Sequence, residues 1–308
     1  MKKVLVCGMN PAWQKTMEFS RLVPYEVNRA ETLRTIASGK GINFARALLN
    51  WGTTSAAVLH PLGGSTGKMI TESLAGEGIP SIAVTTECST RICSTLMCKA
   101  TGTATEIIEP SGTVLPEEYE KLMTVASLEI AGSDALAICG TYPPGIPEHC
   151  YADLVSKAAG AGKPVLLDAC KNIGNALSCG TTLLKINKSE LSGMTGCDSV
   201  EKGIRLCLEK YPLEYVAITA GKECAYIGSR KRIIRITVPA ISNAINPIGA
   251  GDTCSGVFFA EYLSGTEPEE AFARGLCAAT ASCMTDTPAK FEKETAIQLR
   301  EKVELYPL

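Results

Sequence analysis

The sequence predicts an α/β fold built on a doubly wound parallel sheet, with a small β-sheet lid. Short runs that are apolar throughout, typical of strands buried on both faces, recur along the chain. Helical patterns separate most of these runs, and this alternation is typical of parallel strands joined by helices. Two other stretches, about 11–36 and 88–110, alternate β-branched and polar residues, which favours a separate and partly exposed sheet.

The predicted core strands follow one another at spacings that leave room for helices. In order they are Val4–Cys7, Ala56–Leu59, Ala135–Cys139, Val165–Leu167, Leu183–Ile186 and Val216–Ile218. No internal repeat, low-complexity segment or long linker divides the 308 residues. We therefore expect one domain over 1–308, with the lid formed by insertions at about 11–36 and 88–110.

Two helices can be placed from their ends. After Gly39 and Gly41, apolar residues recur at helical spacing until Gly52 ends the run, so the two glycines mark a helix N-terminus. Pro116, followed by two glutamates, begins a second helix with the residues that a first turn favours.

The net charge and the lengths of the apolar runs argue against several kinds of partner and location. Lys and Arg total 30 and Asp and Glu total 32, a net charge of −2, so a dedicated nucleic-acid partner is not expected. No apolar run approaches the ~20 residues that span a bilayer, so we expect no membrane partner. The apolar run Val4–Cys7 is too short for a signal peptide, which predicts a cytoplasmic protein.

The fourteen cysteines are scattered through predicted strands and helices, and no two form a C-x-x-C pair. We interpret them as reduced thiols that act as small core hydrophobes. His60, after a predicted strand, is expected to be structural. Asp168 ends another predicted strand, where it either faces a site or belongs to a turn.

The strongest local signal for chemistry is Asn246-Pro247-Ile248-Gly249-Ala250-Gly251-Asp252, which leads into an apolar helix. Successive backbone N–H groups at such a glycine turn, reinforced by a helix N-terminus, form a cradle for phosphate oxygens. Asp252 beside that cradle is placed to take a proton from an attacking hydroxyl. The alternative is an ordinary strand-to-helix turn in which Asp252 only caps the helix.

Further short sequence motifs occur along most of the chain. They are Asn10-Pro11-Ala12, Val27-Asn28-Arg29, Gly39-Lys40-Gly41-Ile42-Asn43, Leu62-Gly63-Gly64, Thr90-Arg91, Thr105-Glu106-Ile107, Pro143-Pro144-Gly145, Lys185 with Asn187 to Leu191, and Asn246 to Asp252. Their number and order resemble the ribokinase-like sugar kinases, in particular the branch that contains 1-phosphofructokinase and tagatose-6-phosphate kinase. The resemblance implies an enzyme that transfers a phosphoryl group from ATP to an alcohol, with Mg²⁺ as cofactor and a ketohexose phosphate as substrate.

The resemblance also implies roles for single residues. Asp252 resembles the general base, and the N–H groups of Gly249, Ala250 and Gly251 resemble the anion hole for the transferred phosphoryl. The residues that resemble substrate contacts are Gln14, Gly39, Lys40, Asn43 and Arg91, with Arg91 on the lid. Those that resemble nucleotide contacts are Lys185, Asn187, Glu190, Thr219, Gly221 and Lys222. Glu190 resembles the carboxylate that holds Mg²⁺ through water, and the resemblance allows a homodimer formed through the lid.

Three positions depart from the family pattern. Gln14 stands where the family usually has an aspartate that accepts hydrogen bonds from sugar hydroxyls, Ser38 replaces a glycine, and Ile186 replaces a proline. An amide both donates and accepts and carries no charge, so the sugar selected can differ. Two alternatives therefore stay open: a kinase of the same family that acts on an unphosphorylated sugar or nucleoside, and a sugar-phosphate sensor without turnover. The cations Lys40 and Arg91 favour a phosphorylated substrate.

Overall fold

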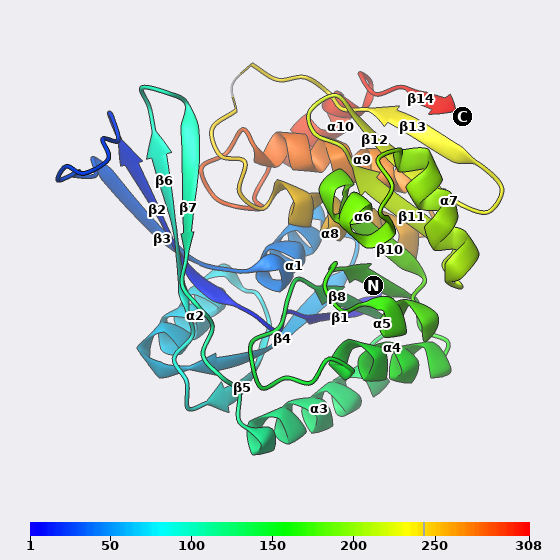
Figure 1. Cartoon of the computed structure of the whole chain (residues 1–308), viewed down its shortest axis with the longest axis horizontal. Helices are drawn as coiled ribbons and strands as arrows, with labels where there is room; N and C mark the ends of the chain where they lie inside the picture. The colour runs from blue at the N-terminus through cyan, green and yellow to red at the C-terminus, as the bar shows by residue number, and fades with distance from the viewer. Residues whose placement is uncertain (243) are drawn as a thin grey trace.

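The computed structural model describes residues 1–242 and 244–308 and contains two β-sheets (Figure 1). Seven strands of the larger sheet run parallel to one another, in the spatial order β11-β10-β9-β8-β1-β4-β5. They are β1 (Lys3–Cys7), β4 (Ser55–Gly63), β5 (Ser81–Thr86), β8 (Ala135–Cys139), β9 (Val165–Asp168), β10 (Leu183–Asn187) and β11 (Tyr215–Thr219).

Helices cover both faces of this sheet. One layer consists of α1 (Lys40–Trp51), α2 (Gly64–Glu77), α8 (Ala250–Leu263), α9 (Pro268–Ser282) and α10 (Lys293–Arg300). The other consists of α3 (Pro116–Ala131), α4 (Cys150–Gly160), α5 (Gly174–Ser178), α6 (Lys188–Thr195) and α7 (Val200–Lys210). Along β1, Val4 and Val6 pack into the first layer, whereas Leu5 and Cys7 pack into the second. The predicted doubly wound architecture is confirmed.

One edge of the large sheet differs from the all-parallel prediction. Strands β12 (Cys224–Gly228), β13 (Ile233–Thr237) and β14 (Leu305–Pro307) extend the sheet beyond β11, and each pairs antiparallel to its neighbour. Only residues 220–223 join β11 to β12. A connection this short forms a hairpin, because a parallel crossover needs a dozen residues or more.

A second correction concerns His60. The sequence ends its strand at Leu59, whereas β4 continues to Gly63 and carries His60 inside it. The His60 ring is fully buried, and its Nε2 lies 2.8 Å from the Ser81 hydroxyl on β5. Burial lowers the pKa of His60 to about 4, so the ring is neutral at neutral pH. This agrees with the structural role expected for it.

The smaller sheet is the lid, and it stands apart from the helical layers at the upper left of Figure 1. Its strands are β3 (Thr32–Ser38), β2 (Ala12–Phe19), β6 (Ile92–Cys98) and β7 (Thr103–Ile108), in that spatial order. The central pair, β2 and β6, is parallel, and the outer pairs are antiparallel. The predicted lid is confirmed, although β3 runs two residues past the predicted stretch.

All fourteen cysteines are free thiols in the part of the chain that the structure describes. Half of them are buried, among them Cys7 on β1 and Cys139 on β8, which supports their interpretation as small core residues. In the same residues, no helix combines the length and apolar character that crossing a membrane requires.

Candidate active site

The candidate site lies where the carboxyl ends of the parallel strands meet the N-termini of α1 and α8, the usual ligand position in open α/β sheets. Gly39, the residue before α1, has φ 110°, and a Cβ on it would lie 3.0 Å from the Cα of Pro11. A Cβ on Gly41 would lie 2.5 Å from the Cα of Gly8. Both positions require glycine, because α1 begins directly against the loop that follows β1.

Asp252 lies in the first turn of α8, which begins after Gly249 in a left-handed conformation (φ 77°). The Asp252 side chain is 8% exposed, and its Oδ2 accepts a hydrogen bond of 2.9 Å from Nδ2 of Asn43 on α1. Burial and the nearby Asp168 carboxylate raise the pKa of Asp252, while Lys40 and the Asn43 bond lower it; the balance lies above the ordinary value.

Asp168, at the end of β9, is the centre of a buried charge cluster. Its Oδ1 lies 2.9 Å from Nζ of Lys40, and its Oδ2 lies 3.5 Å from Nζ of Lys185. The Ser255 hydroxyl on α8 donates to Oδ2 at 2.6 Å. Burial alone would raise the pKa of Asp168, but the two lysines and the Ser255 bond hold it below its ordinary value. Asp168 is therefore an anion that balances two cations.

The same cluster fixes the glycine turn. Nζ of Lys185 donates to the carbonyl of Gly251 at 3.0 Å. The Ser255 hydroxyl has one proton, which it shares between Asp168 Oδ2 at 2.6 Å and the Gly251 carbonyl at 3.0 Å, so its contact with the carbonyl is the weaker one. The peptide that joins Gly251 to Asp252 is thereby held chiefly by Lys185. The Ala250 N–H has a long contact of 3.3 Å with the carbonyl of Pro247. Lys185, predicted as a nucleotide contact, thus lies against the Gly251 carbonyl and is 4% exposed.

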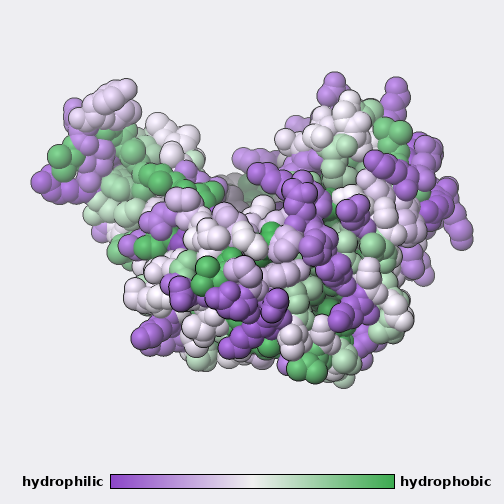
Figure 2. Space-filling view, turned by 60° about the horizontal axis from the view of Figure 1, so that its bottom comes forward, coloured by the Kyte–Doolittle hydropathy of each residue, from purple (hydrophilic) through white to green (hydrophobic). Residues whose placement is uncertain are grey.

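A cleft of about 260 Å³ adjoins this cluster at Lys40 and lies between the core and the lid. Lys40 and Glu190 line it from the core, and Ile108 lines it from the end of β7. Figure 2 shows the hollow between the lid and the rest of the surface. Gln14 lies on β2 with its side chain buried, and its Nε2 donates to the Thr95 hydroxyl at 2.9 Å. One end of the Gln14 amide is therefore occupied within the lid.

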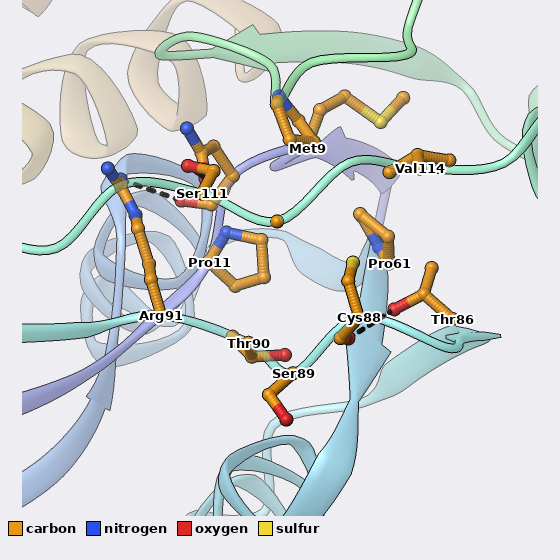
Figure 3. A pocket seen from close by; sticks show the side chains of 13 residues that line it. Met9, Pro11, Pro61, Thr86, Cys88, Ser89, Thr90, Arg91, Ser111 and Val114 are labelled. Atoms are coloured by element: carbon orange, nitrogen blue, oxygen red, sulfur yellow. Dashed lines mark hydrogen bonds between the residues drawn. The ribbon is translucent and has the colours of Figure 1, made fainter.

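Arg91 lines this cleft and also a small cavity of about 20 Å³ next to it, large enough for about one water molecule. It immediately precedes β6, so it lies at the base of the lid and not within the sheet. In Figure 3 its side chain extends toward Ser111, and its Nη2 donates to the carbonyl of Asn10 at 3.2 Å. Among the described residues, Arg91 Nε is buried without a hydrogen-bond partner, and no carboxylate lies within 4.0 Å of the guanidinium.

Asn187 and Glu190 form a reciprocal cap at the start of α6. The Asn187 side chain accepts from the N–H of Glu190 at 2.9 Å, and Glu190 Oε2 accepts from the N–H of Asn187 at 2.8 Å. Glu190 Oε1 points the other way, 3.8 Å from Nζ of Lys40. The described residues hold no cluster of three or more His, Cys, Asp or Glu side chains able to bind a metal by themselves.

The last predicted nucleotide contacts follow the neighbouring strand. Thr219 ends β11 and pairs in register with Asn187 on β10, which brings the two predicted groups together. Gly221 and Lys222 are exposed in the turn beyond it, and Gly221 has φ 89°. Asn187, Glu190 and Thr219 therefore lie together at the carboxyl ends of β10 and β11, and Lys40 and Asn43 lie in the first turn of α1. Gln14 and Arg91 belong to the lid and its base.

Comparison with known proteins gives a family match over most of the chain. Residues 8–290 match the model of the pfkB family carbohydrate kinases. The chain belongs to the pfkB family. It is therefore a carbohydrate kinase, a phosphotransferase for which ATP is the implied donor, and the predicted ribokinase-like membership is confirmed.

Individual relatives agree with the pfkB assignment. The ATP-dependent 6-phosphofructokinase isozyme 2 of Escherichia coli K12 is 27% identical over 253 residues, covering 80% of this chain and 81% of that protein. A structure of phosphofructokinase-2 from Escherichia coli with fructose-6-phosphate superimposes with a TM-score of 0.87 at 22% identity, covering 98% of this chain and 99% of the other. A possible 1-phosphofructokinase from Thermotoga maritima gives 0.87 at 18% identity, covering 99% of each chain.

Sequence reasoning missed Ser255 and left Asp168 undecided. Ser255 follows Asp252 by three residues, a spacing that places both on one face of a helix. That spacing was a usable signal. For Asp168 no local signal distinguishes a turn from a site, because its partners Lys40 and Lys185 come from elements far apart in the sequence.

Proposed function

We propose that this kinase transfers the γ-phosphoryl group of ATP to a hydroxymethyl oxygen of a ketohexose phosphate, with Asp252 as general base. The observation that carries the choice of a phosphorylated substrate is Arg91. It is a cation at the cleft without a carboxylate partner, and its buried Nε lacks a hydrogen-bond acceptor in the described chain. A bound phosphate supplies both the charge and the acceptors that a guanidinium needs.

Lys40 contributes less to this choice than the sequence implied. Its ammonium is already balanced by Asp168 at 2.9 Å and faces Glu190 at 3.8 Å. Burial lowers the pKa of Lys40, but Asp168 and its neighbours raise it above the ordinary value, so the side chain stays protonated. We assign Lys40 to the floor of the cleft, beside Gly39, where it contacts the substrate without being the main phosphate ligand.

In the transfer step, the acceptor hydroxyl oxygen forms a bond to the γ-phosphorus while the bond from that phosphorus to the β-phosphate oxygen breaks. The hydroxyl proton passes to Asp252, and ADP leaves. A carboxylate whose pKa is raised by burial is a better proton acceptor than a solvated one. The N–H groups of Gly249 and Gly251 face the developing charge, with Ala250 secondary because its N–H contacts Pro247.

ATP and its metal are assigned to the edge beyond β10 and β11. Asn187, Thr219, Gly221 and Lys222 supply the nucleotide contacts, while Lys185 supports the glycine turn from behind. Glu190 is suited to Mg²⁺, because kinases hold this ion through few carboxylates, several waters and the phosphates. Its Oε1 is free of the helix cap and faces the cleft. The metal would neutralise charge on the ATP phosphates.

A homodimer formed through the lid completes the proposal. Leu33 on β3 pairs in register with Met17 on β2, which pairs with Leu96 on β6, so the three side chains share one face. Ile107 on β7 lies on the same face, and Leu33 and Ile107 are 58% and 54% exposed. Figure 2 shows hydrophobic surface gathered on the projecting lid. A second copy of the chain would cover this apolar strip.

The test is ADP release with ATP and Mg²⁺ across a matched set of acceptors: fructose 1-phosphate, fructose 6-phosphate, tagatose 6-phosphate, free fructose, ribose and adenosine. We expect one ketohexose phosphate to give a kcat/KM at least about 100-fold above that of free fructose, the effect of one charge-assisted phosphate contact. A response to free sugar or adenosine alone would overturn the substrate class. Ligand binding without ADP release would favour the sensor.

A further inference from the structure

A buried arginine lies behind the proposed base. Arg46 on α1 follows Asn43 by three residues, so the two side chains share one face of the helix. The Arg46 side chain is 3% exposed and forms a two-pronged ion pair with Glu77 at the end of α2, with distances of 2.6 and 2.9 Å. Its Nη2 also donates to the carbonyl of Ala37 on lid strand β3 at 2.7 Å.

The remaining nitrogen of Arg46 reaches Asn43. Nη1 donates to Asn43 Oδ1 at 3.0 Å, and the Ser38 hydroxyl donates to the same oxygen at 3.3 Å. A guanidinium can only donate, so the Asn43 amide must turn its oxygen toward Arg46 and its NH₂ group the other way. That NH₂ group donates to Asp252 Oδ2 at 2.9 Å. The orientation of one amide thus connects Arg46 to Asp252.

We propose that Arg46 is a positioning residue for phosphoryl transfer: it fixes the Asn43 amide in the one orientation that donates to Asp252. The inference rests on the proposed role of Asp252 as the base. If the amide were reversed, Asn43 Oδ1 would face a carboxylate oxygen, and two acceptors in contact would repel each other. Asp252 would then lose its fixed direction toward the acceptor hydroxyl.

The pH dependence follows from the groups around Asp252. These are Asp168 from β9, Lys40 and Asn43 from α1, Lys185 from β10 and the Cys139 thiol from β8. The Asn43 bond lowers the pKa of Asp252, so its loss raises that pKa further. A protonated Asp252 cannot accept a proton. Weakening the Arg46–Asn43 contact therefore shifts the acid limb of the kcat–pH profile to higher pH.

The first variant is Arg46→Lys, which keeps the charge opposite Glu77 but cannot reach Glu77, Ala37 and Asn43 together from a single ammonium. We expect kcat to fall about tenfold or more, KM for ATP to stay within about twofold, and the acid limb to shift upward. The matched control is Arg300→Lys. Arg300 also forks onto a glutamate, Glu270, and donates to a backbone carbonyl, at a site remote from Asp252. It should leave kcat and the pH profile unchanged.

A double-mutant cycle with Asn43→Ala shows whether Arg46 acts through Asn43. If it does, adding Arg46→Lys to Asn43→Ala changes kcat by less than about twofold, because the connecting amide is already gone. If the fold losses in kcat of the two single variants multiply in the double variant, the proposal is wrong. If Arg46→Lys does not fold, the double variant Arg46→Met/Glu77→Met removes both buried charges together, and the same cycle is run with it.

Titration of the Asp252 carboxyl can be measured without turnover, and it therefore tests the positioning role of Arg46 separately from the proposed catalytic role of Asp252. The carboxyl ¹³C signal of Asp252 in aspartate-labelled protein is assigned by its absence in Asp252→Asn, and its titration midpoint is then measured. We expect a higher midpoint in Arg46→Lys than in the wild type, and no change in Arg300→Lys. An unchanged midpoint in Arg46→Lys overturns the positioning role. Full turnover by Asp252→Asn would instead overturn the proposed base while leaving this titration interpretable.

Discussion

Two regions differ in how their polar and apolar groups find partners: the floor, by which we mean Lys40 with Asn43, Asp168, Lys185 and Asp252 next to it, and the lid. In the floor, Asp168 balances Lys40 and Lys185, and Asn43 donates to Asp252, so buried charges are paired inside the protein. In the lid, Leu33 and Ile107 are more than half exposed. Arg91, at the base of the lid, has a buried nitrogen with no acceptor in the described chain.

From this difference we infer separate roles for the two regions, chemistry in the floor and recognition in the lid. A charge network that is complete before any ligand binds costs no reorganisation at the moment of reaction, which suits the transfer of a phosphoryl group. The Arg91 guanidinium and the exposed Leu33 and Ile107 side chains would gain their partners from a bound ligand or a second chain. The lid and its base therefore fit the recognition of substrate and of a second subunit, whereas the floor fits the chemistry.

The largest effect is expected from Asp252→Asn in the floor. Removing a general base lowers kcat about 10²- to 10⁴-fold, and the similar shape of the amide leaves the affinity for ATP within about threefold. Steady-state ADP release and equilibrium titration with ATP measure the two quantities. An unchanged kcat would remove Asp252 from the mechanism and with it the assignment of chemistry to the floor.

A smaller effect is expected from Asp168→Asn. The substitution leaves Lys40 and Lys185 without their shared anion and loosens the Gly251 carbonyl that Lys185 holds. We expect kcat to fall about tenfold or more and the free energy of unfolding to fall by about 3 kcal/mol, as when one partner of a buried ion pair is removed. Asp153→Asn, which changes an exposed carboxylate 3.7 Å from Nε2 of His149, is the control in denaturant titrations. Equal free energies of unfolding for the two variants would contradict the role of Asp168 as the anion that balances Lys40 and Lys185.

The smallest effect on chemistry is expected from Leu33→Asp and Ile107→Asp on the lid face. Charge on the apolar strip should separate a lid dimer into monomers while the free energy of unfolding changes by less than about 1 kcal/mol, because both side chains are exposed. Sedimentation measures the oligomeric state. Leu128→Asp, at a 70% exposed leucine on α3, is the matched control. A wild-type monomer, or dimers that persist in both variants, would refute the lid interface.

The sequence predicted the features that depend on local pattern. Runs apolar on both faces located the parallel strands, and glycines at 39, 41 and 249 marked helix starts because close approach or a left-handed turn excludes a side chain there. The antiparallel edge after β11 was not predicted, because a short connection and not a hydrophobic period determines it. His60 was placed after its strand because the apolar run ends at Leu59, yet β4 continues through His60 to Gly63.

Within the site, motif positions were predictable but contacts were not. The motif from Asn187 to Glu190 also forms a helix cap, and its spacing, a cap residue followed three residues later by a glutamate, was a signal for that second role. Lys185 was predicted as a nucleotide contact, and its contacts with Asp168 and the Gly251 carbonyl were not predicted. Such long-range pairings depend on the packing of β9, β10 and α8 against each other, and no local spacing encodes them.

The most direct test of the division between floor and lid is a specificity ratio measured in two variants. The ratio is kcat/KM for the preferred ketohexose phosphate divided by kcat/KM for the corresponding free sugar, in Asp252→Asn and in Arg91→Ala. We expect Asp252→Asn to lower both values and keep the ratio, and Arg91→Ala to lower the ratio about 10- to 100-fold by removing one charged phosphate contact. An unchanged ratio in Arg91→Ala, or a lost ratio in Asp252→Asn, would contradict the division between floor and lid.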